Sequence, residues 1–339
     1  MSLDLSLAGR SVLLAGADAR TVATIDALLR DGASVTVSLA DGVDAAELPT
    51  SVRDLAARGL VAIASDVDQA AFEVVIRARV PDHASLARDR ASGTGAGTGT
   101  VTLVGGGLGD PGLLTVAGLH AIRAADVIVH DRLAPVSALH EARHDAAVID
   151  VGKIPRGDFT PQERINAVLV EHALAGRNVV RLKGGDNFVF GRGGEEAEAC
   201  AAQGIPVVVI PGVSSSIAAP ALAGIPVTHR ALSQGFTVVS GHVPPGDPRG
   251  KVDWGAVARS NTTIVVLMGV ATLPALTDTL VREGLSPDTP AAVIADAGLP
   301  SMRSVRARLS DIADAAQRDG LGAPAVAVVG PVAALDVLA

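Results

Sequence analysis

A glycine-rich turn and a carboxylate lie within one strand-helix-strand segment, and together they could bind a ligand and move a proton. The segment Leu103–Asp131 reads LVGGGLGDPGLLTVAGLHAIRAADVIVHD. Three glycines follow an apolar strand, where they tolerate positive φ and let a ligand approach the backbone closely. A helix over Leu113–Ala124 then leads to a second strand, Val127–Val129, which delivers Asp131 at its carboxyl end. In an open α/β sheet, ligands bind at that edge.

The composition is that of a globular protein long enough for two or three domains, with 339 residues of which 48% are hydrophobic and 19% charged. Five Phe, one Trp and no Tyr leave few side chains to stack on bases, and a net charge of −8 disfavours nucleic acid and anionic membranes. A single cysteine, Cys200, excludes an intrachain disulfide. Without a secretory signal or a long apolar run, the sequence predicts a cytoplasmic enzyme with no nucleic-acid or membrane partner.

A Gly/Thr/Ala stretch at residues 91–100 has the composition of a flexible linker. Upstream, in residues 1–90, two predicted strands flank a helix over Thr21–Asp31, which indicates a small Rossmann-like α/β unit. Its turn, Gly16-Ala17-Asp18-Ala19-Arg20, keeps only the first fingerprint glycine and places a carboxylate where phosphate would sit. The unit is therefore degenerate, and we predict that it does not bind NAD.

Beyond the linker, short apolar strands alternate with helices, which is typical of an α/β fold with parallel strands. Pro211-Gly212 interrupts this pattern, so we expect a first lobe at residues 101–212 and a second at 213–339. The strands are predicted at Val101–Val104, Val127–Val129, Ala147–Val151, Asn178–Leu182 and Val207–Ile210, then at Thr237–Ser240, Thr262–Leu267, Ala291–Ala295 and Ala325–Val329.

Motifs in these lobes recur in an order and at a spacing that a single glycine turn lacks. They are HDRL at 130–133, VGK at 151–153, TPQERIN at 160–166, RLKGGDNFVFGRGGEE at 181–196 and GIPVTHR at 224–230. Together they resemble the uroporphyrinogen-III C-methyltransferases of the tetrapyrrole methylase family, over about Val101–Val332. The resemblance implies the two-lobed class III methyltransferase fold and a homodimer. It also implies S-adenosylmethionine-dependent methylation of uroporphyrinogen III at C2 and C7, giving precorrin-2 for sirohaem or cobalamin.

The same resemblance gives Asp131 the role of proton acceptor and Lys153 that of proton donor. Methylation of a pyrrole carbon leaves a cationic ring that must lose a proton, and a positioned carboxylate suits that step. An N-terminal helix cap is the alternative for Asp131, and a solvated loop lysine is the alternative for Lys153.

By resemblance, the methyl-donor site draws on loops from both lobes. In the first loop, Leu108 replaces the family's usual proline. In the last loop, Ala297 stands where the family commonly has glycine, so the last loop shifts if alanine cannot adopt the glycine's conformation. The implied residues are Gly107, Leu108, Gly109, Asp110, Gly184, Gly185, Asp186, Val189, Ser214, Ser215, Met268 and Ala297.

The eight carboxylates of uroporphyrinogen require local cations, for which guanidinium groups are well suited. We expect Arg132, Lys153, Arg156, Lys183 and Arg230 to bind them. No histidine spacing indicates a metal site. Two alternatives remain open: a fused sirohaem synthase that keeps dehydrogenase and ferrochelatase activity, and methylation of a later precorrin.

Overall fold

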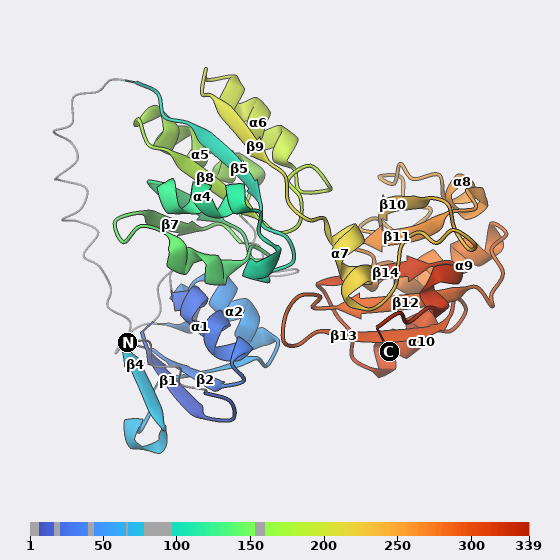
Figure 1. Ribbon diagram of the computed structural model, residues 1–339, viewed down its shortest axis with the longest axis horizontal. Helices are drawn as coiled ribbons and strands as arrows, with labels where there is room; N and C mark the ends of the chain where they lie inside the picture. The colour runs from blue at the N-terminus through green and yellow to red at the C-terminus, as the bar shows by residue number, and fades with distance from the viewer. Residues whose placement is uncertain are drawn as a thin grey trace. The chain divides into compact units, whose positions relative to one another are not determined.

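The computed structural model forms two compact units, Met1–Gly212 and Val213–Ala339 (Figure 1). Most of the predicted linker lies outside the described residues. Among the residues that are described, no helix is long and apolar enough to cross a membrane. The described residues are 7–16, 21–39, 44–65, 67–77, 97–152 and 160–338.

The first unit begins with a four-stranded parallel sheet of order β3-β2-β1-β4. This arrangement confirms the predicted Rossmann-like unit, although β3, β4 and α2 were not predicted. Its elements are β1 (Ser11–Ala15), α1 (Thr21–Arg30), β2 (Ser34–Ser38), η1 (Ala45–Glu47), α2 (Thr50–Ala57), β3 (Val61–Ala64), η2 (Gln69–Ala71) and β4 (Val74–Arg77).

A second parallel sheet follows in the same unit, with the order β7-β6-β8-β5-β9. Its inner strands β5, β6 and β8 are buried on both faces, as continuous apolar strands require. In β6, Val127 and Val129 join a core with α5 and α6, whereas Ile128 joins the core on the other face. The elements are β5 (Val101–Gly105), η3 (Pro111–Leu113), α4 (Val116–Ala124), β6 (Val127–His130), η4 (Val136–Glu141), β7 (Ala147–Asp150), α5 (Gln162–Leu174), β8 (Val179–Lys183), α6 (Gly193–Ala201) and β9 (Val207–Ile210).

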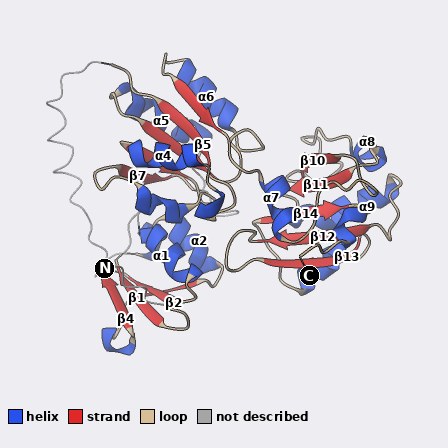
Figure 2. Cartoon of the chain, in the orientation of Figure 1, coloured by secondary structure: helices blue, strands red, loops and turns tan. Residues whose placement is uncertain are grey.

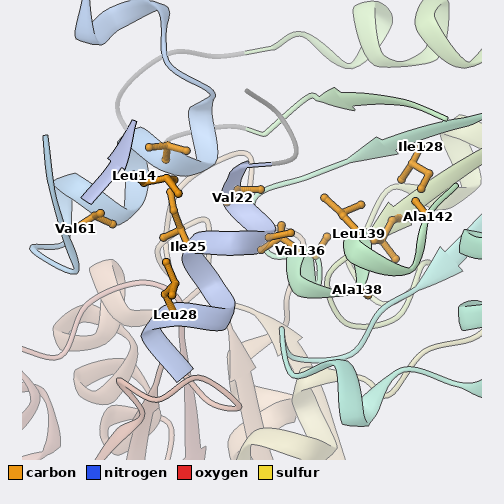
Figure 3. Packing of buried hydrophobic residues seen from close by; sticks show 14 of the residues in the cluster. Leu14, Val22, Ile25, Leu28, Val61, Ile128, Val136, Ala138, Leu139 and Ala142 are labelled. Atoms are coloured by element: carbon orange, nitrogen blue, oxygen red, sulfur yellow. The ribbon is translucent and has the colours of Figure 1, made fainter. Parts of the chain in front are cut away.

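One hydrophobic core joins the two sheets of the first unit. Val22 and Ile25 of α1 belong to the same buried cluster as Val136 and Leu139 of η4 and Ile128 of β6. Figure 3 shows α1 lying against η4, with Val22 and Val136 at the junction. The amino-terminal sheet and its helix α1 therefore share a core with the lobe that contains the second sheet, although the sequence predicts a separate amino-terminal domain.

The second unit has a mixed sheet of order β10-β11-β14-β12-β13 with helices alongside (Figure 2). Because β14 runs antiparallel to both β11 and β12, the carboxyl ends of β10, β11 and β12 share one edge. The elements are α7 (Ser215–Leu222), β10 (Phe236–Ser240), α8 (Trp254–Arg259), β11 (Thr263–Leu267), η5 (Val270–Thr272), α9 (Leu273–Arg282), β12 (Pro290–Ala295), β13 (Arg303–Arg308), α10 (Ile312–Arg318), β14 (Ala325–Val329) and η6 (Pro331–Ala334).

The shared core predicts that an apolar truncation in α1 destabilises the first unit. Ile25 is fully buried, so Ile25→Ala should lower the free energy of unfolding by about 2–5 kcal/mol through lost packing and a residual cavity. Urea unfolding followed by circular dichroism measures this change. Val116→Ala, at an exposed position on α4, is the control and should change stability by less than about 0.5 kcal/mol. A loss for Ile25→Ala as small as that of the control would contradict the burial of α1.

Candidate active site

The carboxyl edge of the β7-β6-β8-β5-β9 sheet brings three loops together. Loop 105–110 follows β5, loop 131–135 follows β6 and loop 184–187 follows β8. Gly107 and Gly185 exchange two backbone hydrogen bonds with N···O distances of 3.2 and 2.6 Å. The Gly184 N–H donates to Asp131 Oδ1 at 3.3 Å. The predicted ligand turn and the predicted carboxylate therefore belong to one connected site.

Glycine allows these loops to touch through their backbones. A Cβ on Gly212 would lie 2.3 Å from the carbonyl oxygen of Gly185, and one on Gly184 would lie 2.6 Å from that of Leu133. Both distances are too short for any side chain. These glycines allow the loops of the candidate site to pack directly against one another.

Asp131 lies in the middle of this edge with 27% of its side chain exposed. Its Oδ2 is 3.3 Å from Arg181 Nη2, and its Oδ1 accepts a hydrogen bond from the Leu133 N–H at 3.1 Å. Burial opposes ionisation, but the charges of Arg181 and Lys183 and the Gly184 N–H outweigh it and lower the pKa of Asp131 below its ordinary 3.8. Asp131 holds a turn rather than the start of a helix, since the residue before η4 is Pro135. It is an ionised carboxylate that solvent reaches, and its role as proton acceptor stays a prediction.

A buried carboxylate, Glu196 of α6, neutralises the cations beneath Asp131. Its Oε1 lies 3.0 Å from Arg181 Nε, and its Oε2 lies 3.0 Å from Lys183 Nζ. Arg181 and Lys183 project from the same face of β8 because they are two residues apart. Glu196 is completely buried, and two cations and two carboxylates form one cluster.

The position of Lys183 corrects its predicted role in substrate binding. Its ammonium group is buried and donates to both oxygens of Glu196. Burial, reinforced by the neighbouring Arg181 charge, lowers the pKa of Lys183 below 10.5 despite the opposing carboxylates. Lys183 is therefore an internal partner of Glu196 and not a surface cation.

The two aspartates predicted at the methyl-donor site hold their own loops. Asp110 Oδ1 accepts the Gly112 N–H at 2.8 Å at the start of η3. Asp186 accepts the N–H groups of Phe188 at 2.9 Å and Gly212 at 3.1 Å. These contacts fix the backbone around the candidate site, and direct ligand contact by either carboxylate stays a prediction.

The departures at Leu108 and Ala297 both fit their local backbone. Leu108 lies between Gly107 and Gly109, whose φ values are 73° and 78°, and does not itself take a positive φ. Ala297 likewise keeps a negative φ, while Asp296 beside it has φ 55° and Gly298 has φ 81°. The left-handed positions in both loops thus fall on the flanking residues, so leucine and alanine introduce no backbone strain.

The predicted substrate cations are scattered. Arg132 pairs with Asp54, at 3.1 Å between Nη1 and Oδ2. Arg230 is exposed and lies beside Asn261 and Thr262, which precede β11, so it is at the opposite sheet edge from Met268. Lys153 and Arg156 fall outside the described residues.

In the second unit, two predicted donor contacts share one edge of the sheet. Met268 follows β11 and Ala297 follows β12, and the two strands run in the same direction. Met268 is 48% exposed and has φ 58°, a conformation that costs free energy for a side chain of this size. Ser214 caps α7, since its Oγ accepts the Ser216 N–H at 3.3 Å, and Ser215 begins the helix.

Residues 100–313 match the family model of Tetrapyrrole (Corrin/Porphyrin) Methylases. The chain belongs to the tetrapyrrole methylase family. A uroporphyrin-III C-methyltransferase from Thermus thermophilus complexed with S-adenyl homocysteine is 39% identical, with a TM-score of 0.59 over 69% of this chain and 98% of that one. Another crystal structure of the Thermus enzyme is 38% identical, with a TM-score of 0.58 over 69% and 96%.

The curated relatives of this tetrapyrrole methylase include siroheme synthases. That of Neisseria meningitidis serogroup C (strain 053442) is 46% identical over 237 residues, which are 70% of this chain and 48% of the relative. That of Gluconacetobacter diazotrophicus is 45% identical over 234 residues, or 69% and 50%. The methylase therefore spans about half the length of the curated relatives it matches.

Two polar residues of the methylase site were missed by sequence reasoning. Glu196 could have been found from its partners, because two cations on one face of a buried strand require a buried anion. Asn187 is fully buried, and its Nδ2 donates to the Leu103 carbonyl at 3.2 Å and the Ile210 carbonyl at 2.9 Å. Asn187 thereby links β5 to β9, and no signal within its motif distinguishes that role from a loop asparagine.

The charge cluster predicts a strong difference between two adjacent glutamates. Glu196→Gln leaves two buried cations without a full counter-charge and should lower the free energy of unfolding by about 3–5 kcal/mol. Glu195→Gln disturbs an exposed pair with Arg192 and should change the free energy of unfolding by about 0–1 kcal/mol. Urea unfolding of both variants is the measurement. Equal losses would contradict the cluster.

The ionisation of Asp131 predicts a pH-dependent contribution to stability. Because the folded protein binds this proton more weakly than the unfolded chain, ionised Asp131 stabilises the fold above the ordinary pKa of 3.8. That contribution disappears as the pH falls through the lowered pKa. The difference in unfolding free energy between wild type and Asp131→Asn should therefore be greatest near neutral pH and shrink on acidification. A difference that does not vary with pH is the contrary result.

Proposed function

We propose that this methylase transfers methyl groups from S-adenosylmethionine to C2 and C7 of uroporphyrinogen III, giving precorrin-2. The observation that carries the proposal is Asp131, an ionised carboxylate that solvent reaches and that is hydrogen-bonded to the loops of the predicted donor site. The similarity to uroporphyrin-III C-methyltransferases supports the choice of substrate. Its use in sirohaem synthesis, a homodimeric state and a cytoplasmic location belong to the same proposal.

One loop of the first unit has the chemistry that would bind S-adenosylmethionine. Loop 184–190 presents exposed apolar side chains, including Phe188 at 57% and Val189 at 36%, next to a backbone whose glycines carry no side chain. Apolar surface of this kind suits an adenine ring, and bare backbone suits hydrogen bonding to an amino-acid group.

S-adenosylmethionine supplies an electrophilic methyl group on a sulfonium sulfur. As the new carbon–carbon bond forms and the sulfur–carbon bond breaks, the tetrapyrrole gains a positive charge, which the Asp131 carboxylate stabilises. Asp131 Oδ2 then accepts the proton whose loss restores conjugation. Arg181 and the Gly184 N–H keep the carboxylate ionised and oriented before this step.

We further propose that the amino-terminal sheet binds no NAD and that the site uses no metal. In a dinucleotide-binding fold, the pyrophosphate lies at the amino end of the first helix. Here Thr21, Val22 and Ala23 at that end of α1 are all buried. Residues 17–20 of the turn lie outside the described residues, so support comes from this burial and from the incomplete fingerprint.

The proposal predicts a product two methyl groups heavier than uroporphyrinogen III. Anaerobic incubation of uroporphyrinogen III with the protein and S-adenosylmethionine, followed by mass spectrometry, measures the mass of the product. Asp131→Asn should reduce kcat by about 10²–10⁴-fold, the usual contribution of a positioned base. Asp145→Asn, a surface position of the same lobe, is the control and should retain activity. Absence of doubly methylated product from the wild type would reject the proposed substrate.

A further inference from the structure

Three strand exits on one edge of the β7-β6-β8-β5-β9 sheet each contact a polar side chain of α1 or α2. We propose that residues 7–77 act as a positioning element, whose side chains Arg30, Ser51 and Asp54 hold the site loops in their working conformation. This inference rests on the proposed function of the site. It assigns a role to a unit that lacks a dinucleotide fingerprint and whose first helix is buried at its amino end.

The first contact reaches the glycine loop. Arg30, the last residue of α1, donates from Nη2 to the Gly109 carbonyl at 2.8 Å. Asp26, one helical turn earlier, accepts from Arg30 Nε at 2.9 Å and so orients the guanidinium. This charged hydrogen bond to the carbonyl of a left-handed glycine adds a second restraint to the loop that Asp110 also holds.

The second contact reaches the residue after Asp131. Asp54 of α2 pairs with Arg132, and both side chains are only 10% exposed. Limited solvent access makes such a pair stronger than a surface ion pair. Since Arg132 is the direct neighbour of Asp131, its anchoring restricts the backbone that carries the proposed proton acceptor.

The third contact joins the start of α2 to the end of β7. The residue before α2 is Pro49, which offers no side-chain cap. Asp150 substitutes for a cap, because its Oδ2 accepts from the Ser51 N–H at 3.0 Å and from Ser51 Oγ at 2.9 Å. Its Oδ1 accepts the Gly152 N–H at 2.8 Å, immediately before Lys153. One carboxylate thus couples the start of α2 to the carboxyl end of β7.

These contacts add a function that apolar docking alone would not provide. The hydrophobic core already binds α1 to η4. The three polar contacts instead meet Gly109, Arg132 and Asp150, which belong to three different strand exits on one sheet edge. Catalysis of methyl transfer depends on alignment, so small displacements of these loops should reduce the rate.

The test compares Arg30→Ala and Asp54→Asn with Arg10→Ala, which removes an exposed ion pair with Glu73 on the same unit. Arg30→Ala should raise KM for S-adenosylmethionine about tenfold with little change in kcat, since it frees the glycine loop. Asp54→Asn should lower kcat about tenfold with little change in that KM, since it frees the neighbour of Asp131. Arg30→Lys should restore much of the lost affinity, and Arg10→Ala should behave as wild type.

Hydrogen exchange of residues 105–110 and 131–133 provides a readout independent of the substrate. Both variants should exchange faster in the loop that each contact holds, while their thermal unfolding temperature separates this effect from global destabilisation. Wild-type exchange and kinetics in both variants would overturn the inference, as would losses that follow stability alone. If the wild type fails to methylate uroporphyrinogen III, the proposed function is rejected, and the exchange data still decide whether the unit positions the loops.

Discussion

The buried pairing of Glu196 with Arg181 and Lys183 is the constraint on which the candidate site depends. Two cations on the same face of β8 would be untenable inside a lobe without an anion, so α6 must pack where Glu196 meets them. That packing leaves Arg181 within 3.3 Å of Asp131. The cations of this buried cluster therefore help to lower the pKa of the carboxylate at the surface of the lobe.

Backbone proximity gives the same edge its shape. Glycines at 105, 184 and 212 let three loops approach where any Cβ would collide, and aspartates at 110 and 186 hold the turns by accepting N–H groups. The loops at this edge therefore combine two kinds of residue, those that form the surface of the candidate ligand site and those that make that surface rigid. A resemblance in sequence does not separate the two kinds, but hydrogen bonds do.

Local patterns in the sequence could predict most of the strands and the place of Asp131. Val207–Ile210 and Ala325–Val329 match β9 and β14 because each is an apolar run bounded by turn residues. β13 was missed because its sequence, RSVRAR, has no apolar run; the strand forms by antiparallel pairing with β12. The role of Lys183 was missed, although its place beside Arg181 on one face of a buried strand indicated a buried anion; that anion, Glu196, lies on a helix that starts ten residues later along the chain.

The shared core of α1 and η4 changes how this chain can vary or be divided. A fragment beginning at residue 97 would expose Val136 and Leu139 and would leave the carboxylate of Asp150 without the helix end it caps. The glycine-rich stretch has the composition of a linker between modules, but a cut there would uncover apolar side chains of η4 that α1 buries. Substitutions on the inward face of α1, such as at Val22 or Ile25, therefore act on the core that α1 shares with η4.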